Sequence, residues 1–171
     1  MNEREPSTGQ RPPMSYYDGL YQTYATGILR LCYYYLGNRE QAEDVVQDVF
    51  VRLISSGAVI REGSEKSYLL KAAVNHCKDL WRSAWIRRTV LGSPALELTP
   101  DPSGISDGME KAELMNAICK LRAEYREVIL LYYYQSCTIE QISQILGVPP
   151  GTVSSRITRG RQKLKDILEG K

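Results

Sequence analysis

The sequence predicts an all-α protein of two small helical domains joined by a flexible linker, with a helix-turn-helix in the second domain. Apolar residues recur at the helical period through most of the chain, and no stretch shows the alternation that is typical of strands. Prolines, glycines and serines interrupt this pattern between Val90 and Gly108, which is typical of a linker. We therefore expect a tail at residues 1–14, domains at 15–88 and 108–171, and a linker at 89–107.

The first helix is expected from Ser15 or Asp18 to about Leu36, where Gly37 and Asn38 break the chain. Aromatic and aliphatic residues recur along it at the helical period. This spacing predicts that one inward face carries Tyr17, Leu20, Tyr21, Tyr24, Ile28, Leu31 and Tyr35. Core packing explains such a stripe more simply than a surface that stacks on bases or ligands.

The second helix, residues 39–55, has an apolar face and a polar face. The apolar residues expected inward are Ala42, Val45, Val46, Val49, Phe50 and Leu53. The opposite face carries Glu43, Asp44, Gln47 and Asp48 within two turns. Such a face is either a plain solvated surface or a docking surface for a basic partner, and its position alone does not distinguish the two.

The third helix, residues 64–87, places Asn75, Lys78 and Arg82 away from its buried side, on which His76 is expected to pack. Trp81 and Trp85 lie near its end. Cations for phosphates, an amide for base edges and rings for stacking suit melted DNA. The tryptophans are equally well explained as core anchors.

Two further helices are expected after the linker. The apolar stripe of the first contains Met109, Leu114, Ile118 and Leu121. The stripe of the second contains Tyr125, Val128, Ile129, Tyr132 and Tyr133.

The stretch from Thr138 to Leu168 has the pattern of a helix-turn-helix. Thr138 and Gln141 have the spacing of a capping box, and Gly147 stands where a helix commonly ends. Pro150 can begin the next helix because its first residues need no amide donor. The outer side of that helix carries Ser154, Ser155, Thr158, Arg159, Gln162 and Lys163. Hydroxyls and arginines on a second helix are typical of a reader of the DNA major groove, although a solvated helix pair has a similar pattern.

Charge distribution supports contact with a polyanion more than net charge does, since the formal net charge is only +2. Cations gather in residues 66–88 and 156–171, and an acidic connector separates them.

The four cysteines and the lone His76 lack the spacing of metal ligands, so we expect no metal and no cofactor. No nucleophile with a matching base and no phosphate loop is visible, which argues against an enzyme. The polar start of the chain and its short apolar runs predict a cytoplasmic protein without membrane contact.

The segments AEDVVQDVF, KAAVNHCKDLWR and TIEQISQILGVPPGTVSSRITRGRQKL occur together in a familiar order. With their surroundings they resemble the extracytoplasmic-function group of bacterial RNA polymerase sigma factors. The resemblance covers both domains. It implies that the first domain binds polymerase and opens the minus-ten promoter element. It also implies that the second domain reads the minus-thirty-five element.

The resemblance also assigns residues. AEDVVQDVF is similar to the segment that docks on the polymerase clamp helices, which makes Asp44, Gln47 and Asp48 candidates for binding the core enzyme. The segment around the minus-ten element implies base reading by Asn75, with Lys78 and Arg82 near phosphates. In the second domain, groove-facing positions are Ser154, Ser155, Thr158 and Arg159, and phosphate contacts are Arg156 and Arg161.

Three partners are implied by the resemblance: the RNA polymerase core enzyme, promoter DNA and an anti-sigma factor. The resemblance also shows departures. Ser154 stands where a lysine or arginine is common, and Pro149 replaces a frequent serine-type helix cap. The main alternative is a helix-turn-helix regulator that binds an operator without polymerase. Such a regulator would bind DNA tightly by itself, whereas a sigma factor would need the core enzyme.

Overall fold

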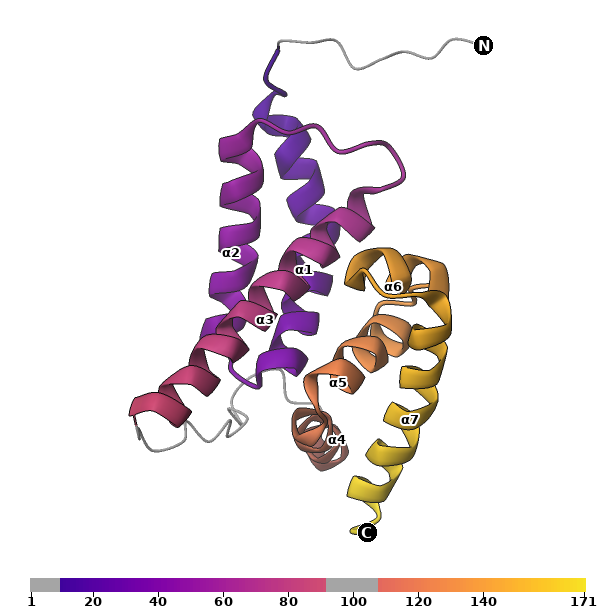
Figure 1. Cartoon of the computed structure of the whole chain (residues 1–171). Helices are drawn as coiled ribbons and strands as arrows, with labels where there is room; N and C mark the ends of the chain where they lie inside the picture. The colour runs from indigo at the N-terminus through magenta and orange to yellow at the C-terminus, as the bar shows by residue number, and fades with distance from the viewer. Residues whose placement is uncertain (1–9, 92–107) are drawn as a thin grey trace.

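The computed structural model describes residues 10–91 and 108–171, with side chains for residues 10–84 and 111–171. These residues form only helices and connecting turns, which confirms the predicted all-α class. In chain order the elements are α1 (Met14–Leu36), α2 (Arg39–Ser56), α3 (Glu65–Leu91), α4 (Gly108–Lys120), α5 (Ala123–Ile129), a π-helix η1 (Leu130–Tyr134), α6 (Ile139–Leu146) and α7 (Pro150–Leu168). Figure 1 shows α1, α2 and α3 grouped on one side and α4 to α7 on the other. The expected tail and linker lie largely outside the described residues.

The break between the first two helices has the expected local chemistry. Gly37 ends α1 in the left-handed conformation, with φ of 68°. Asn38 then caps α2, because its side-chain oxygen accepts a hydrogen bond of 2.9 Å from the Gln41 amide. The helix α1 begins at Met14, one residue before the expected Ser15. Pro13 stands at its N-cap, and no side chain caps this end.

Burial confirms most of the predicted inward faces. All six apolar residues expected inside on α2 are buried. On α1, Tyr17 and Tyr35 are almost fully buried, but Tyr21 is 52% exposed. Four residues turn a helix by slightly more than one revolution, so Tyr21 lies at the edge of the stripe that Tyr17 begins. There its ring meets the edge of the Phe50 ring, with centroids 5.0 Å apart.

The fifth predicted helix changes type along its length. After α5 the backbone widens into the π-helix η1, where the amide of Gln135 donates to the carbonyl of Leu130 over 3.1 Å. Within this wider turn Leu130 and Leu131 stay buried, whereas the next side chains turn away from the core. Tyr132 and Tyr133, which the helical period placed on the inward stripe, are therefore 39% and 49% exposed.

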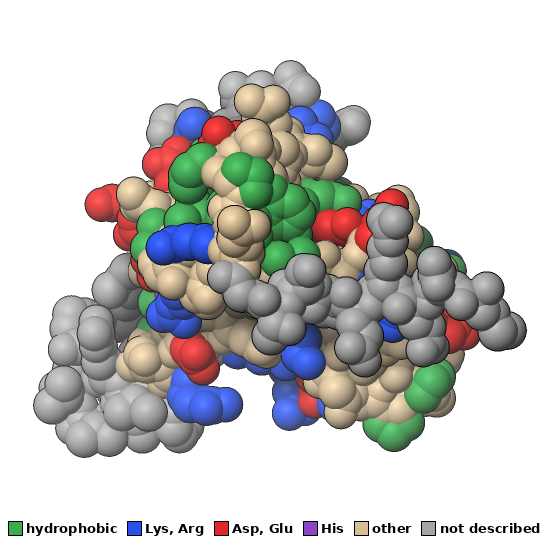
Figure 2. All heavy atoms as spheres, turned by 90° about the horizontal axis from the view of Figure 1, so that it is seen from above, with side chains coloured by type: hydrophobic (Ala, Val, Ile, Leu, Met, Phe, Trp, Pro, Cys, Tyr) green, Lys and Arg blue, Asp and Glu red, His purple; other side chains and the backbone are tan. Residues whose placement is uncertain are grey.

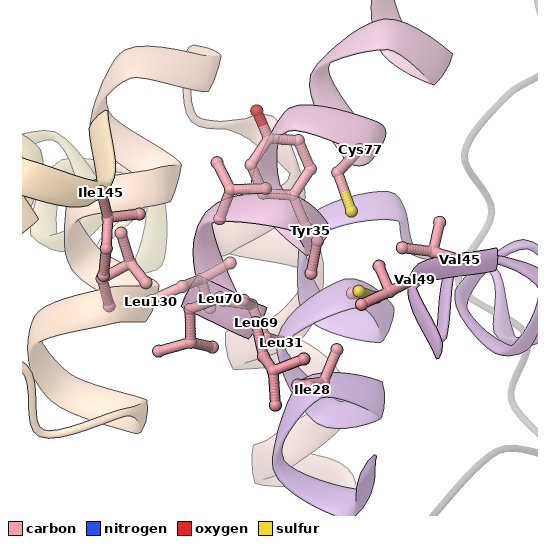
Figure 3. Close-up of a cluster of buried hydrophobic side chains, with 14 of the residues drawn as sticks. Ile28, Leu31, Tyr35, Val45, Val49, Leu69, Leu70, Cys77, Leu130 and Ile145 are labelled. Atoms are coloured by element: carbon pink, nitrogen blue, oxygen red, sulfur yellow. The ribbon is translucent and has the colours of Figure 1, made fainter. Parts of the chain in front are cut away.

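The two domains pack directly against each other, which the sequence did not predict. Leu69 and Leu70 of α3 are buried in the same apolar cluster as Leu130 and Ile145 of the second domain. Figure 3 shows these side chains approaching one another from opposite sides. Among the described residues, no helix is long and apolar enough to cross a membrane.

Candidate nucleic-acid interface

The helix-turn-helix formed by α6 and α7 has the predicted capping residues and turn. The Thr138 amide donates to Gln141 Oε1 over 2.9 Å, and the Gln141 amide donates to Thr138 Oγ1 over 3.1 Å. This is the complete capping box. Gly147 ends α6 with φ of 67°, and Pro150 is the first residue of α7. Pro149 offers no side-chain cap, at a cost of about 1 kcal/mol relative to serine.

The outer face of α7 presents most of the expected groups to solvent. Ser154, Ser155, Thr158, Arg159 and Arg161 are exposed. The hydroxyls of Ser155 and Thr158 donate to backbone carbonyls of α7, each over 3.1 Å. Their oxygens therefore remain available as acceptors, and their orientation is fixed by the helix.

Gly160 sets how closely α7 approaches α5. A Cβ atom built at this position would lie 3.1 Å from Ile129 Cγ1 and 3.3 Å from Tyr125 Cβ. Both distances are shorter than ordinary carbon contacts, so the absence of a side chain permits this crossing. Val153 and Ile157 are buried on the same side of α7. The inner face thus fixes the orientation of the outer one.

The polar face of α2 is accessible, because Asp44, Gln47 and Asp48 are all exposed. One of them has a partner within the domain. Asp48 Oδ2 lies 3.5 Å from Nε2 of His76, whose side chain is only 16% exposed. The prediction that His76 packs against the domain rather than acting as a catalyst agrees with this position.

On α3 the predicted contact residues differ in accessibility. Asn75 and Arg82 are exposed, whereas the Lys78 side chain is 32% exposed. Trp81 is half-buried, and its indole N–H donates to the Tyr35 carbonyl over 3.3 Å. Of the two readings left open by the sequence, the structure thus shows Trp81 as a packing residue. The side chain of Trp85 lies outside those described.

Arg126 is a buried residue that the sequence reading missed, with only 2% exposure. Its guanidinium donates to the carbonyl oxygens of Ile118, Cys119 and Leu121 at the end of α4 and to that of Tyr35 in the first domain. It also lies 4.5 Å from the centre of the Trp81 ring. Burial lowers the pKa of this guanidinium, and nearby thiol and hydroxyl groups oppose the shift.

Glu127, the next residue, is 3% exposed and lies between two predicted DNA contacts. Its Oε2 is 3.3 Å from Lys78 Nζ, and its Oε1 is 3.8 Å from Arg156 Nη1. Burial raises the pKa of the Glu127 carboxyl, and Lys78 and then Arg156 oppose this shift. Arg156, expected on the DNA-facing side, is consequently only 25% exposed.

A groove of about 500 Å³ lies between the domains at this point, lined by Lys78, Trp81, Arg82, Glu127, Leu146 and Arg156, among others. Figure 2 shows Lys and Arg side chains on both sides of a notch at the lower edge of the face drawn there. Within the described part of the chain, no three His, Cys, Asp or Glu side chains are grouped so that they could hold a metal ion. Cys32, Cys77 and Cys137 are buried and Cys119 is half-buried, all as free thiols.

The arrangement matches known proteins in both domains. Residues 20–87 match the family model for sigma-70 region 2, and residues 111–164 match the model for sigma-70, region 4. The extracytoplasmic-function (ECF) RNA polymerase sigma factor SigE of Mycolicibacterium smegmatis is 34% identical, over 95% of this chain and 65% of its own. SigW of Bacillus subtilis, also named an ECF RNA polymerase sigma factor, is 34% identical over 85% of this chain and 84% of its own.

Solved structures agree on the fold. The sigma factor RpoE of Bartonella quintana, solved with the anti-sigma factor NepR, superposes with a TM-score of 0.78 at 20% identity, over 91% of this chain and 98% of that one. CnrH, solved with the cytosolic domain of CnrY, gives 0.67 at 22% identity, over 92% and 90%. Both family models and the relative covered over most of its length identify this chain as a member of the ECF RNA polymerase sigma factor family, which initiates transcription at promoters and is not an enzyme.

Proposed function

We propose that the two domains of this sigma factor divide its work as the exposed faces suggest. In this proposal the first domain, residues 15–88, docks on the core enzyme through α2 and contacts the minus-ten element through α3. The second domain, residues 108–171, reads the minus-thirty-five element through α7. The observation that best supports this division is the capped helix-turn-helix whose second helix presents hydroxyls and arginines outward.

Docking through α2 rests on three exposed polar groups on one face. Asp44, Gln47 and Asp48 lie within about one turn of one another on the side opposite the buried apolar residues. Helix packing holds the face rigid, and its two carboxylates suit a basic partner surface. We assign Asn75 to base reading and Arg82 with Lys78 to phosphates, since an amide pairs with base edges and cations with the backbone.

In α7, Ser154, Ser155, Thr158 and Arg159 are assigned to the major groove. Arg156 and Arg161 are assigned to phosphates on its flanks. The proposal includes an anti-sigma factor as a regulatory partner, in line with the complex of RpoE with the anti-sigma factor NepR named above. It also places the protein in the cytoplasm, where bacterial polymerase meets promoter DNA.

Reversal of charge on α2 tests the docking surface. The double variant Asp44→Lys with Asp48→Lys should lose co-purification with core polymerase. A matched control carries the same change at two exposed acidic residues elsewhere in the first domain, Asp18→Lys with Glu62→Lys. Equal binding by both double variants would remove the docking assignment, whereas loss in the first alone supports it.

Replacement of one arginine tests the reading helix. Arg159→Ala should weaken transcription by the reconstituted holoenzyme from a promoter with an intact upstream element. It should also reduce the difference in transcription between that promoter and promoters with a substituted upstream element. For the base that Arg159 contacts, the reduction corresponds to about 1–3 kcal/mol of discrimination. An unchanged ranking of the variants would contradict the assignment of Arg159 to base reading.

A further inference from the structure

One contact joins the proposed docking face of α2 to α3, the helix proposed to contact the minus-ten element. Nε2 of His76 on α3 lies 3.5 Å from Oδ2 of Asp48 on α2. Asp48 belongs to the proposed docking face, whereas His76 has no role in the proposed function. The lone histidine of the chain is thus directed at a residue that is proposed to meet the core enzyme.

Packing fixes the position of the His76 ring. Its side chain is only 16% exposed, and its neighbours Ala73 and Cys77 on α3 are completely buried. A side chain held in a packed environment has few rotamers open to it, so the Nε2 edge of the ring stays directed at α2. Asn75, the preceding residue, is exposed to solvent on another side of the same helix.

Asp48, in contrast, remains open to a partner. Its side chain is 51% exposed, and its contact with His76 is made through Oδ2. A basic group of the core enzyme can therefore reach the carboxylate without displacing the ring. A side chain that is free in solution loses rotamer freedom when it binds, which weakens the complex. Contact with a fixed ring removes part of that freedom before the partner arrives.

The chemistry of imidazole also preserves the charge of Asp48. In the neutral tautomer with its proton on Nε2, imidazole can donate to a carboxylate that keeps its full negative charge. Glu43 on the same helix differs, because Nε of Arg39 donates to its Oε1 over 2.8 Å and a guanidinium is always charged. That ion pair offsets the charge of Glu43, so Glu43 attracts a basic partner less than Asp48 does.

We infer that His76 is a positioning residue of the core-docking surface, which holds the Asp48 carboxylate oriented and charged for a basic group of the core enzyme. This inference rests on the proposed function, because it requires Asp48 to contact the core. It gives His76 no contact with the partner itself. Orienting one side chain in advance should raise the affinity for core polymerase by about twofold to tenfold.

Three substitutions of His76 separate the effect of the nitrogen from that of the ring. His76→Phe keeps a flat ring but has no ring nitrogen. His76→Gln places an amide nitrogen at the same distance along the side chain as Nε2, so it can donate to Asp48. His76→Asn is the matched control for glutamine, because its amide nitrogen corresponds to Nδ1 and stays too close to the backbone to reach Asp48.

The assay measures the dissociation constant of each fluorescently labelled sigma factor for core polymerase, by anisotropy, after circular dichroism has shown that the variant is folded. His76→Phe and His76→Asn should bind about twofold to tenfold more weakly than the wild type. His76→Gln should recover most of the difference. If the phenylalanine variant does not fold, the comparison of glutamine with asparagine gives the same answer.

A double-mutant cycle with Asp48→Ala shows whether His76 acts through that carboxylate. In the Asp48→Ala background, His76→Asn should cause no further loss of affinity, because the group that the ring positions is absent. A general structural role for His76 would instead weaken binding equally in both backgrounds. That result would overturn the inference.

Two other results would also count against His76 while leaving the docking assignment intact, provided that Asp48→Ala itself weakens binding. These are wild-type affinity in His76→Asn, and equal losses in the glutamine and asparagine variants. Failure of the proposed function has a different signature. Unchanged binding by Asp48→Ala would contradict the docking role proposed for Asp48, and the inference about His76 would fall with it.

Discussion

The close crossing of α5 and α7 predicts that Gly160→Ala destabilises the second domain. In an ordinary helix interior this substitution stabilises, because alanine restricts the unfolded chain and gains up to ~1 kcal/mol in helix propensity. At Gly160 the added methyl would meet Ile129 Cγ1 at 3.1 Å and Tyr125 Cβ at 3.3 Å. The local preference and the tertiary contact therefore act in opposite directions.

The tertiary contact should dominate. Tyr125 Cβ is attached to its own backbone and cannot move by a change of rotamer, and β-branched Ile129 is stiff within a helix. Relief requires the helices to move apart, and overpacking of this kind costs about 1–3 kcal/mol. After subtraction of the propensity gain, we expect a net loss of about 1 kcal/mol in the free energy of unfolding.

Gly151→Ala is the matched control, because Gly151 lies in the same helix with nothing within 4 Å of an added Cβ. Urea unfolding of both variants, followed by the circular dichroism of the helices, gives two midpoints to compare with the wild type. We expect Gly151→Ala to match or exceed the wild-type midpoint and Gly160→Ala to fall below it. Equal midpoints would show that the crossing of α5 and α7 accommodates a methyl group at Gly160 without loss of stability. That result would refute the argument that Gly160 is required for their close approach.

Two further changes test the capping box and the buried charges. Thr138→Ala removes the cap that holds the Gln141 amide and should cost about 1 kcal/mol, seen as a lower thermal midpoint, whereas Thr138→Ser should restore most of it. Because burial raises the pKa of Glu127, its favourable contribution to stability is complete below the usual carboxyl range and is lost as pH rises through the raised value. The free energy of unfolding, measured at a series of pH values, should show this decline in the wild type and a smaller decline in Glu127→Gln. Identical pH profiles for the two proteins would contradict a raised pKa at Glu127.

Local signals predicted the helix ends and inner faces well. Asn38, Gly147 and the pair Thr138 and Gln141 act through neighbours within a few residues, so their geometry is contained in the sequence. The predicted faces failed where a small rotation mattered, at Tyr21 on the margin of its stripe and at Tyr133 within the π-helix η1. A period of about 3.6 residues cannot anticipate a local widening of the backbone.

The buried charges could not be predicted in the same way. Burying Arg126 and Glu127 is unfavourable unless partners meet them, and those partners come from helices far away in sequence. Tyr35 and Lys78 lie about 90 and about 50 positions earlier in the chain. One signal was present, because both charges interrupt an apolar run that includes Tyr125 and Val128 and is otherwise buried. It predicts an unusual site but does not identify its partner.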